Sequence, residues 1–214
     1  MKKHLMRLFL LNCLLLLSIC VVRAQDRSDF YFTHVNGENG LSASNVKAIL
    51  QDSYGFMWFG TKNGLNRFDG KKVRIYNCYD EKRGIGNNNI SALFEDKNKN
   101  IWVGTEDAGI NCLEKKTGTF TNYQPVPGMK SLSHTNIRGL AASGDNLWVG
   151  HVIHGIDLMD IRTRKVIKHY DLLKDAQTVK NSTVKCIKVL REGEVLVGTE
   201  DGIFRYDYLN DRFV

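Results

Sequence analysis

The sequence predicts an all-β protein built as an incomplete β-propeller of about four blades, each a sheet of four antiparallel strands. A strand-patterned segment occurs four times, beginning at residues 46, 90, 137 and 184. The anchor residues Trp58, Trp102, Trp148 and Leu196 are spaced 44, 46 and 48 residues apart, a period typical of propellers and other repeat proteins. No sustained helical periodicity follows residue 24, which disfavours an all-α repeat.

The first unit shows how one blade is encoded. The strand-forming run Val46–Leu50 precedes the turn sequence Asp52-Ser53-Tyr54-Gly55, whose carboxylate can accept backbone N–H groups. The apolar run Phe56–Phe59 predicts a second strand buried on both faces. After a reversal at 60–64, residues 65–68 predict a third strand and 72–76 an alternating outer strand. Four antiparallel strands in about 30 residues correspond to one propeller blade.

The later units repeat this order, with outer strands expected at 119–123 and 165–170. The predicted blades lie near 41–77, 85–123, 132–170 and 181–214. In the fourth unit Leu196 replaces the tryptophan, and the third unit is one residue shorter before Trp148. We expect the tryptophans to wedge between blades and the glycines that follow them to let backbones pass closely. These structural repeat positions are Asp52, Trp58, Gly60, Asp96, Trp102, Gly104, Trp148, Gly150 and Gly198.

Residues 1–24 predict a secretory signal peptide, and the alternative is an uncleaved membrane anchor. Lys2, Lys3 and Arg7 precede the apolar run 8–22, and small residues flank Arg23 at a cleavage site. The chain carries a net charge of +7, and four of its basic residues lie in this leader, so cleavage would leave +3. This mild charge gives no reason to expect nucleic-acid binding. We therefore expect residues 25–214 to be exported and periplasmic.

The first unit carries a family resemblance. The pattern Leu41-Ser42-x-x-x-Val46, followed by Asp52-x-x-Gly55-x-x-Trp58-x-Gly60-Thr61-x-x-Gly64-Leu65-Asn66-Arg67-Phe68-Asp69, resembles the two-component regulator propeller repeat. The resemblance extends over about residues 30–214, and Ala108 is an insertion in the second unit. It implies the periplasmic sensor of a hybrid two-component histidine kinase of Bacteroidetes, which responds to carbohydrate breakdown products. In that family the membrane helix, the kinase, the receiver and the DNA-binding domain follow the propellers.

Ligand-binding residues are expected in the loops between second and third strands, where polar residues vary inside a constant frame. The loop candidates are Lys62, Asn63, Glu106, Asp107, His151, His154, Glu200 and Asp201. The connectors between blades add Arg83, Asn87, Asn88, Asn89, His134 and Asn136, and Tyr79 could stack on a sugar ring. Such amide, carboxylate and basic groups suit the hydroxyls of an oligosaccharide. The competing interpretation is that these are ordinary solvated loop residues.

Catalytic and metal chemistry have little support in the sequence. His151 and His154 have no evident third metal ligand, and neither a Gly-x-Ser-x-Gly elbow nor a phosphate-binding loop occurs. We therefore expect no catalytic residue, no metal and no cofactor. The full sensor could form a homodimer, and membrane contact would come only from sequence beyond this segment. The alternatives are a stand-alone exported propeller that serves as a protein-interaction scaffold, or a propeller lyase or hydrolase.

An incomplete ring predicts two uncovered apolar blade faces. Residues 30–34 could supply a strand to a closing blade. We expect the isolated chain to be prone to aggregation.

Overall fold

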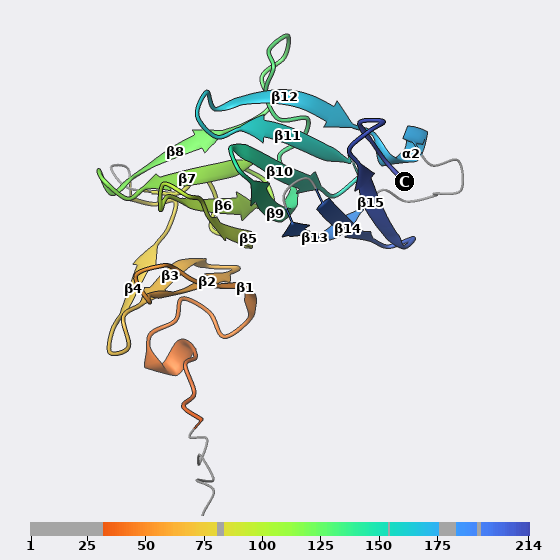
Figure 1. Cartoon of the computed structure of the whole chain (residues 1–214). Coiled ribbons are helices and arrows are strands. Elements are labelled where there is room, and N and C mark those ends of the chain that lie inside the picture. The colour runs from red at the N-terminus through yellow and green to blue at the C-terminus, as the bar shows by residue number, and fades with distance from the viewer. Residues whose placement is uncertain (1–31, 81–83, 154, 176–182, 192–193) are drawn as a thin grey trace, which may run out of the picture. The chain divides into compact units, whose positions relative to one another are not determined.

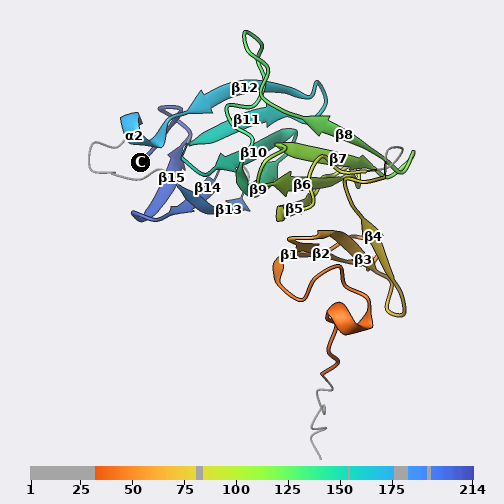
Figure 2. The same ribbon diagram turned by 180° about the vertical axis from the view of Figure 1, so that it is seen from behind.

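Four antiparallel sheets follow one another along the chain in the computed structural model (Figures 1 and 2). The structure describes residues 32–80, 84–153, 155–175, 183–191 and 194–214. The predicted signal peptide at 1–24, Arg83 and His154 lie outside the described residues. The unit Val35–Val214 contains all the described strands. Residues 32–34 belong to the other unit and are not in a strand.

Each sheet is one blade whose strands lie in sequence order. Blade 1 comprises β1 (Val46–Gln51), β2 (Met57–Thr61), β3 (Gly64–Phe68) and β4 (Val73–Tyr76). Blade 2 comprises β5 (Ile90–Glu95), β6 (Ile101–Thr105), β7 (Ile110–Glu114) and β8 (Thr119–Tyr123). Blade 3 comprises β9 (Ile137–Ser143), β10 (Asn146–His151), β11 (Ile156–Asp160) and β12 (Lys165–Tyr170). Blade 4 comprises β13 (Val184–Arg191), β14 (Glu194–Thr199), β15 (Ile203–Asp207) and β16 (Arg212–Phe213).

The prediction of an all-β propeller with four four-stranded blades is confirmed. Helical structure within the described residues is limited to the 3-10 turn η1 (Gly37–Asn39) and the short helix α2 (Leu172–Asp175). None of the described helices is both long and apolar enough to span a membrane.

The first strands of consecutive blades lie side by side: β5 contacts β1 and β9, and β9 also contacts β13 (Figure 1). Three apolar clusters fill the spaces between blades, and each contains one of the anchor tryptophans. Trp58 lies in the cluster of blades 1 and 2, Trp102 in that of blades 2 and 3, and Trp148 in that of blades 3 and 4. All three side chains are buried. The core is therefore divided among the blade interfaces, as a stack of small sheets requires.

The turn after the first strand is held by a buried carboxylate. Asp52 accepts hydrogen bonds from the backbone N–H groups of Tyr54 at 2.9 Å and Phe56 at 3.1 Å. Its second oxygen accepts the indole N–H of Trp58 at 2.8 Å. Asp96 repeats the arrangement in blade 2. The residue type that organises the turn therefore also orients the tryptophan.

The glycine two residues after each tryptophan makes room for the next blade. A Cβ atom at Gly60 would lie 2.6 Å from Cγ2 of Ile90, the first residue of β5. A Cβ atom at Gly104 would lie 2.7 Å from the side chain of Ile137, and one at Gly150 would lie 2.5 Å from the side chain of Val184. The approaching group is thus a β-branched side chain of the neighbouring blade, where the sequence analysis expected backbone.

Several large apolar side chains are exposed on the first and fourth blades. Ile49 of β1 is 64% exposed, Leu190 of β13 is 52% exposed and Ile203 of β15 is 76% exposed. Ile49 pairs with Phe59 in the row next to that of Trp58, so its side chain lies on the face of blade 1 opposite to Trp58. These exposures agree with the expectation of uncovered apolar faces, while aggregation of the chain stays a prediction.

Candidate ligand-binding site

The predicted loops and connectors lie next to one another, because backbone hydrogen bonds join them. The N–H of Gly64, after the first of these loops, donates to the carbonyl of Asn88 at 2.8 Å. Gly109 donates to Thr135 at 2.8 Å, and Val152 donates to Asn136 at 3.2 Å. The loops of blades 1 and 2 are thus fixed to the connector that enters the next blade, whereas the loop of blade 3 is fixed to the connector that enters blade 3 itself. Polar groups from the two segment types can therefore face one ligand.

Glu106 joins three blades. One of its oxygens lies 2.8 Å from Nζ of Lys47 in β1 and 3.1 Å from a guanidinium nitrogen of Arg138 in β9. Its other oxygen accepts a hydrogen bond from the amide of Asn89. Partial burial tends to raise the pKa of Glu106, but Lys47 and Arg138 outweigh that effect and hold its pKa below the usual value. The cluster fixes the inner edges of blades 1, 2 and 3 relative to one another.

The remaining loop candidates are mostly exposed. Lys62 and Asn63 occupy the loop between β2 and β3, and the amide of Asn63 donates to the carbonyl of Ser42 at 3.3 Å. Asp107 is exposed beside the Glu106 cluster. Glu200 forms an ion pair with Lys185 at 2.5 Å, and Asp201 is exposed next to it. These side chains are accessible to a ligand, and their predicted role stays a prediction.

His151 does not lie on an exposed loop. It is the last residue of β10, its side chain is fully buried, and its Nε2 lies 2.8 Å from Oδ2 of Asp157. His169 contacts the other oxygen of Asp157 at 2.8 Å. His151 takes the position that threonine holds at 61 and 105, and both threonines are also fully buried.

Asp157 belongs to a structural series that the sequence analysis missed. Its carboxylate accepts the N–H of Ser133 at 2.7 Å, as Asn66 accepts that of Ser42 at 2.8 Å and Asn111 that of Gly86 at 2.8 Å. Each side chain ties the segment that leads into its own blade to the third strand. In the sequence this series is marked by an Asn or Asp that follows Leu65, Ile110 and Ile156, and this repeated residue could have predicted the contact.

The electrostatics of Asp157 follow from these contacts. Burial acts to raise its pKa, but hydrogen bonds from His151, His169 and the Ser133 N–H outweigh burial and hold the pKa well below its usual range. The hydroxyl of Ser133 lies 3.1 Å from Asp157, so it is bonded to the acid of the group. A nucleophilic serine would instead be hydrogen-bonded to the histidine base. The cluster therefore has the geometry of a structural hydrogen-bond network.

The connector residues serve mainly in turns. Asn88 accepts the N–H of Cys78 through its side chain at 2.8 Å, and Asn87 accepts the N–H of Asn89 at 2.7 Å. The Nδ1 atom of His134 accepts the N–H of Asn136 at 3.1 Å. Tyr79 is 80% exposed and is free to contact solvent or a ligand on its ring face. In the described part of the chain no three His, Cys, Asp or Glu side chains are arranged to hold a metal ion.

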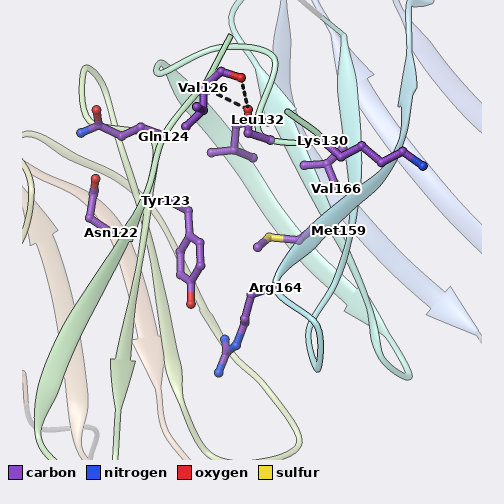
Figure 3. Close-up of a pocket in the computed structure, with 10 residues that line it drawn as sticks. Asn122, Tyr123, Gln124, Val126, Lys130, Leu132, Met159, Arg164 and Val166 are labelled. Atoms are coloured by element: carbon purple, nitrogen blue, oxygen red, sulfur yellow. Dashed lines mark hydrogen bonds between the residues drawn. The ribbon is translucent and has the colours of Figure 1, made fainter. Parts of the chain in front are cut away.

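A separate pocket of about 190 Å³ lies between blades 2 and 3 (Figure 3). Tyr123, Leu132, Met159 and Val166 form its apolar walls, and Arg164 lies at one end. The guanidinium of Arg164 is anchored by Glu114 at 2.8 Å and by Sγ of Cys112 at 3.2 Å, and it covers the ring of Trp102 at 4.6 Å. The Arg164 side chain therefore covers the ring of Trp102.

The fold and its recurring Asp–Trp–Gly framework define a repeat-built β-propeller. More particularly, residues 40–63 and 84–107, in blades 1 and 2, match the model of the two-component regulator propeller family. The resemblance noted in the sequence is thereby confirmed.

Known proteins that resemble the chain include extracellular domains of two-component systems and a histidine kinase. The extracellular domain of a hybrid two-component system from B. thetaiotaomicron is 27% identical with a TM-score of 0.75, over 85% of this chain and 26% of that chain. A second such domain from the same organism is 20% identical with a TM-score of 0.71, over 86% and 27%, and shows the fold alone. A histidine kinase of Formosa agariphila is 46% identical over 55 residues, 26% of this chain and 4% of the kinase. The chain thus spans about a quarter of the solved domains.

Proposed function

We propose that this chain is a ligand-sensing propeller segment of a hybrid two-component regulator, exported to the periplasm. The proposal is supported by the match of residues 40–63 and 84–107 to the two-component regulator propeller model and by the similarity of the fold to the extracellular domain of a hybrid two-component system. In this proposal the ligand is a carbohydrate, and binding is passed across the membrane by sequence outside this chain. Homodimers of the complete sensor would transmit the signal.

The loop surface supports a polyhydroxylated ligand. Lys62, Asn63 and Asp107 are exposed on neighbouring blades and offer ammonium, amide and carboxylate groups. Asp107 accepts no hydrogen bond from a described residue, so its oxygens are available to sugar hydroxyls. Polar side chains on loops that a rigid sheet positions are a common source of ligand specificity.

The Glu106 cluster offers a route from ligand to blade geometry. Lys47 and Arg138 lie on the first strands of blades 1 and 3 and share one carboxylate. A ligand that competes for Glu106 or for either cation would change the balance of charge that holds three blades together. Binding at the loops would then alter the relative positions of blades, which is the change that a sensor must pass on.

The experiment is a reporter assay in the organism that carries the gene. The complete gene product is expressed as wild type, as Lys62→Ala with Asn63→Ala, and as Asp107→Asn, and transcription of its target genes is followed after exposure to oligosaccharides. Lys188→Gln, an exposed change on blade 4, is the control. The proposal expects a saccharide response that the loop variants weaken and the control retains. No response to any saccharide, or responses equal in all variants, would overturn it.

A further inference from the structure

Two arginines lie directly opposite each other on the face of blade 1 that packs against blade 2. Arg67 of β3 pairs with Arg74 of β4, in the same cross-strand row as Trp58. Like charges directly opposite in an antiparallel pair repel each other. Neither guanidinium forms an ion pair or donates a hydrogen bond to any residue in the described ranges, and Nε of Arg67 is buried without a partner. Asp69 interacts with Arg67 only electrostatically, so neither arginine has a carboxylate in direct contact among the described residues.

Aromatic rings hold these arginines in place without satisfying their N–H groups. The guanidinium of Arg67 lies 4.6 Å from the ring of Phe56, and that of Arg74 lies 5.0 Å from the ring of Tyr76. Such cation–π contacts leave the in-plane donors of the guanidinium unused. The two side chains are thus positioned, but their hydrogen-bonding capacity is left for another molecule.

The arginines line a pocket of about 180 Å³ between blades 1 and 2. Trp58 and Tyr76 of blade 1 contribute to its wall, and blade 2 contributes Lys115 and Gly118. The carboxylate of Asp52 lies nearby, but Lys115 neutralises it at 2.7 Å and Trp58 donates to it. The net charge around the pocket is therefore positive.

The equivalent space at the other two interfaces is filled by a side chain. The residue before the outer strand has a left-handed backbone in blades 2, 3 and 4: Gly118 with φ 69°, Arg164 with φ 61° and Asp211 with φ 49°. Arg164 covers Trp102 at the second interface. Gly118 has no side chain to cover Trp58, and nothing lies within 4 Å of the place where its Cβ would be. The pocket exists because residue 118 has no side chain to fill it.

The third interface shows what fits such a space. There the carboxylate of Asp211 pairs with Lys168 and accepts hydrogen bonds from the hydroxyls of Tyr170 and Tyr206, each at 2.6 Å. Lys168 pairs with Leu158 in the row of Trp148, which is the position of Arg74 in blade 1. A carboxylate supplied by the protein thus meets the outer-strand cation at one interface, while the same cation position at the first interface has no carboxylate.

We propose that the pocket over Trp58 binds a small anion through Arg67 and Arg74, in the place that the Asp211 carboxylate takes two blades further along. The ligand class is a molecule with a carboxylate or sulfate group, which two guanidinium forks can bind. The site lies at the outer strands, apart from the loops proposed for saccharide binding, and it does not depend on the proposed sensor function.

The test follows the thermal midpoint of the purified chain in sodium sulfate and in sodium acetate, with sodium chloride keeping the ionic strength constant. The wild type is expected to show a saturable rise in midpoint. Arg67→Gln and Arg74→Gln are expected to weaken the apparent affinity about tenfold, since each removes charge-assisted hydrogen bonds. Lys188→Gln, which removes an exposed cation from blade 4, should respond like the wild type. A response to sulfate alone supports the site and indicates a sulfate group in the ligand. A response to both anions supports the site and indicates that it accepts either a carboxylate or a sulfate group.

A second pair of variants separates a built site from general attraction. Gly118→Asp places a carboxylate where blade 4 has Asp211, and Gly118→Asn is its neutral match; both residues tolerate a left-handed backbone better than most. The aspartate variant should have the higher midpoint in chloride and should no longer respond to sulfate or acetate, whereas the asparagine variant should still respond. No saturable rise in the wild type, or an equal rise in Arg67→Gln or Gly118→Asp, would overturn the proposal.

Discussion

The carboxylate of Asp52 accepts a hydrogen bond from the indole Nε1 of Trp58 at 2.8 Å. Asp96 and Trp102 repeat this contact at 2.9 Å in the next blade. In blade 3 only residues 144–145 separate β9 from β10, where blades 1 and 2 have five residues, and Nε1 of Trp148 is buried with no partner among the described residues. The three tryptophans therefore share a packing role but differ in hydrogen bonding.

This difference predicts unequal effects of the same substitution. Trp58→Phe removes packing volume and a buried hydrogen bond, whereas Trp148→Phe removes similar volume and an indole N–H that had no partner. We expect Trp58→Phe to lower the free energy of unfolding by about 1 kcal/mol more than Trp148→Phe does. Urea denaturation of both variants measures the difference. Equal losses would show that the Asp52 contact contributes nothing to stability.

A second prediction concerns the contact between Gly104 and Ile137. A Cβ at residue 104 would lie 2.7 Å from Cγ2 of Ile137, so Gly104→Ala should destabilise the chain by about 1–3 kcal/mol through overpacking. Ile137→Ala removes the clashing group but leaves a cavity. The double variant should therefore be more stable than the two single losses imply when added. Strict additivity in urea denaturation would contradict this account of the glycine.

The ionisation of Asp52 predicts a pH dependence. Burial tends to raise its pKa, but hydrogen bonds from Lys115, Trp58 and the Tyr54 N–H, with the charge of Lys115, lower the pKa below its usual value. Because the folded-state pKa is the lower one, the stabilisation is present above the unfolded pKa and is lost as pH falls through the folded pKa. The free energy of unfolding of Asp52→Asn should consequently fall less than that of the wild type between about pH 6 and about pH 3. Urea denaturation at these two pH values measures the difference. An unchanged pH dependence would exclude this role for Asp52.

Glu106 and Asp107 offer a matched pair for testing the three-blade cluster. Glu106 contacts Lys47 and Arg138, whereas the adjacent Asp107 is exposed and forms no ion pair with a described residue. Glu106→Gln should reduce the free energy of unfolding by about 1 kcal/mol at low salt, and the loss should shrink as salt screens the partly exposed charges. Asp107→Asn should have almost no effect. Similar losses in both variants would argue against the cluster.

The repeat made the fold predictable from sequence, because each blade carries the same strands and turns. The outer strands expected at 119–123 and 165–170 have the same bounds in the structure. The second strand of blade 1 lies at Met57–Thr61, one to two residues beyond the apolar run, because Gly60 and Thr61 also pair with β1 and β3. Hydrophobicity alone does not mark residues that continue a ladder through backbone pairing.

The site was less predictable, because its contacts cross blades. His151 occurs beside a loop in sequence, but its partner Asp157 lies on the next strand and only the folded sheet shows that both are buried. Lys47 and Arg138 are 91 residues apart in the numbering and meet only through Glu106. Gly118 provides no side chain to cover Trp58, and this becomes evident only when the position of Gly118 in the fold is compared with that of Asp211. Spacing within one repeat carries no information about such neighbours.

The most direct test of the sensor proposal is calorimetric titration of the purified chain with a panel of oligosaccharides. The proposal predicts saturable binding of at least one saccharide, weakened in the variant with Lys62→Ala and Asn63→Ala and unchanged in Arg67→Gln. Absence of binding across the panel, or binding that the loop substitutions leave unaltered, would contradict the claim that these propeller loops recognise a carbohydrate.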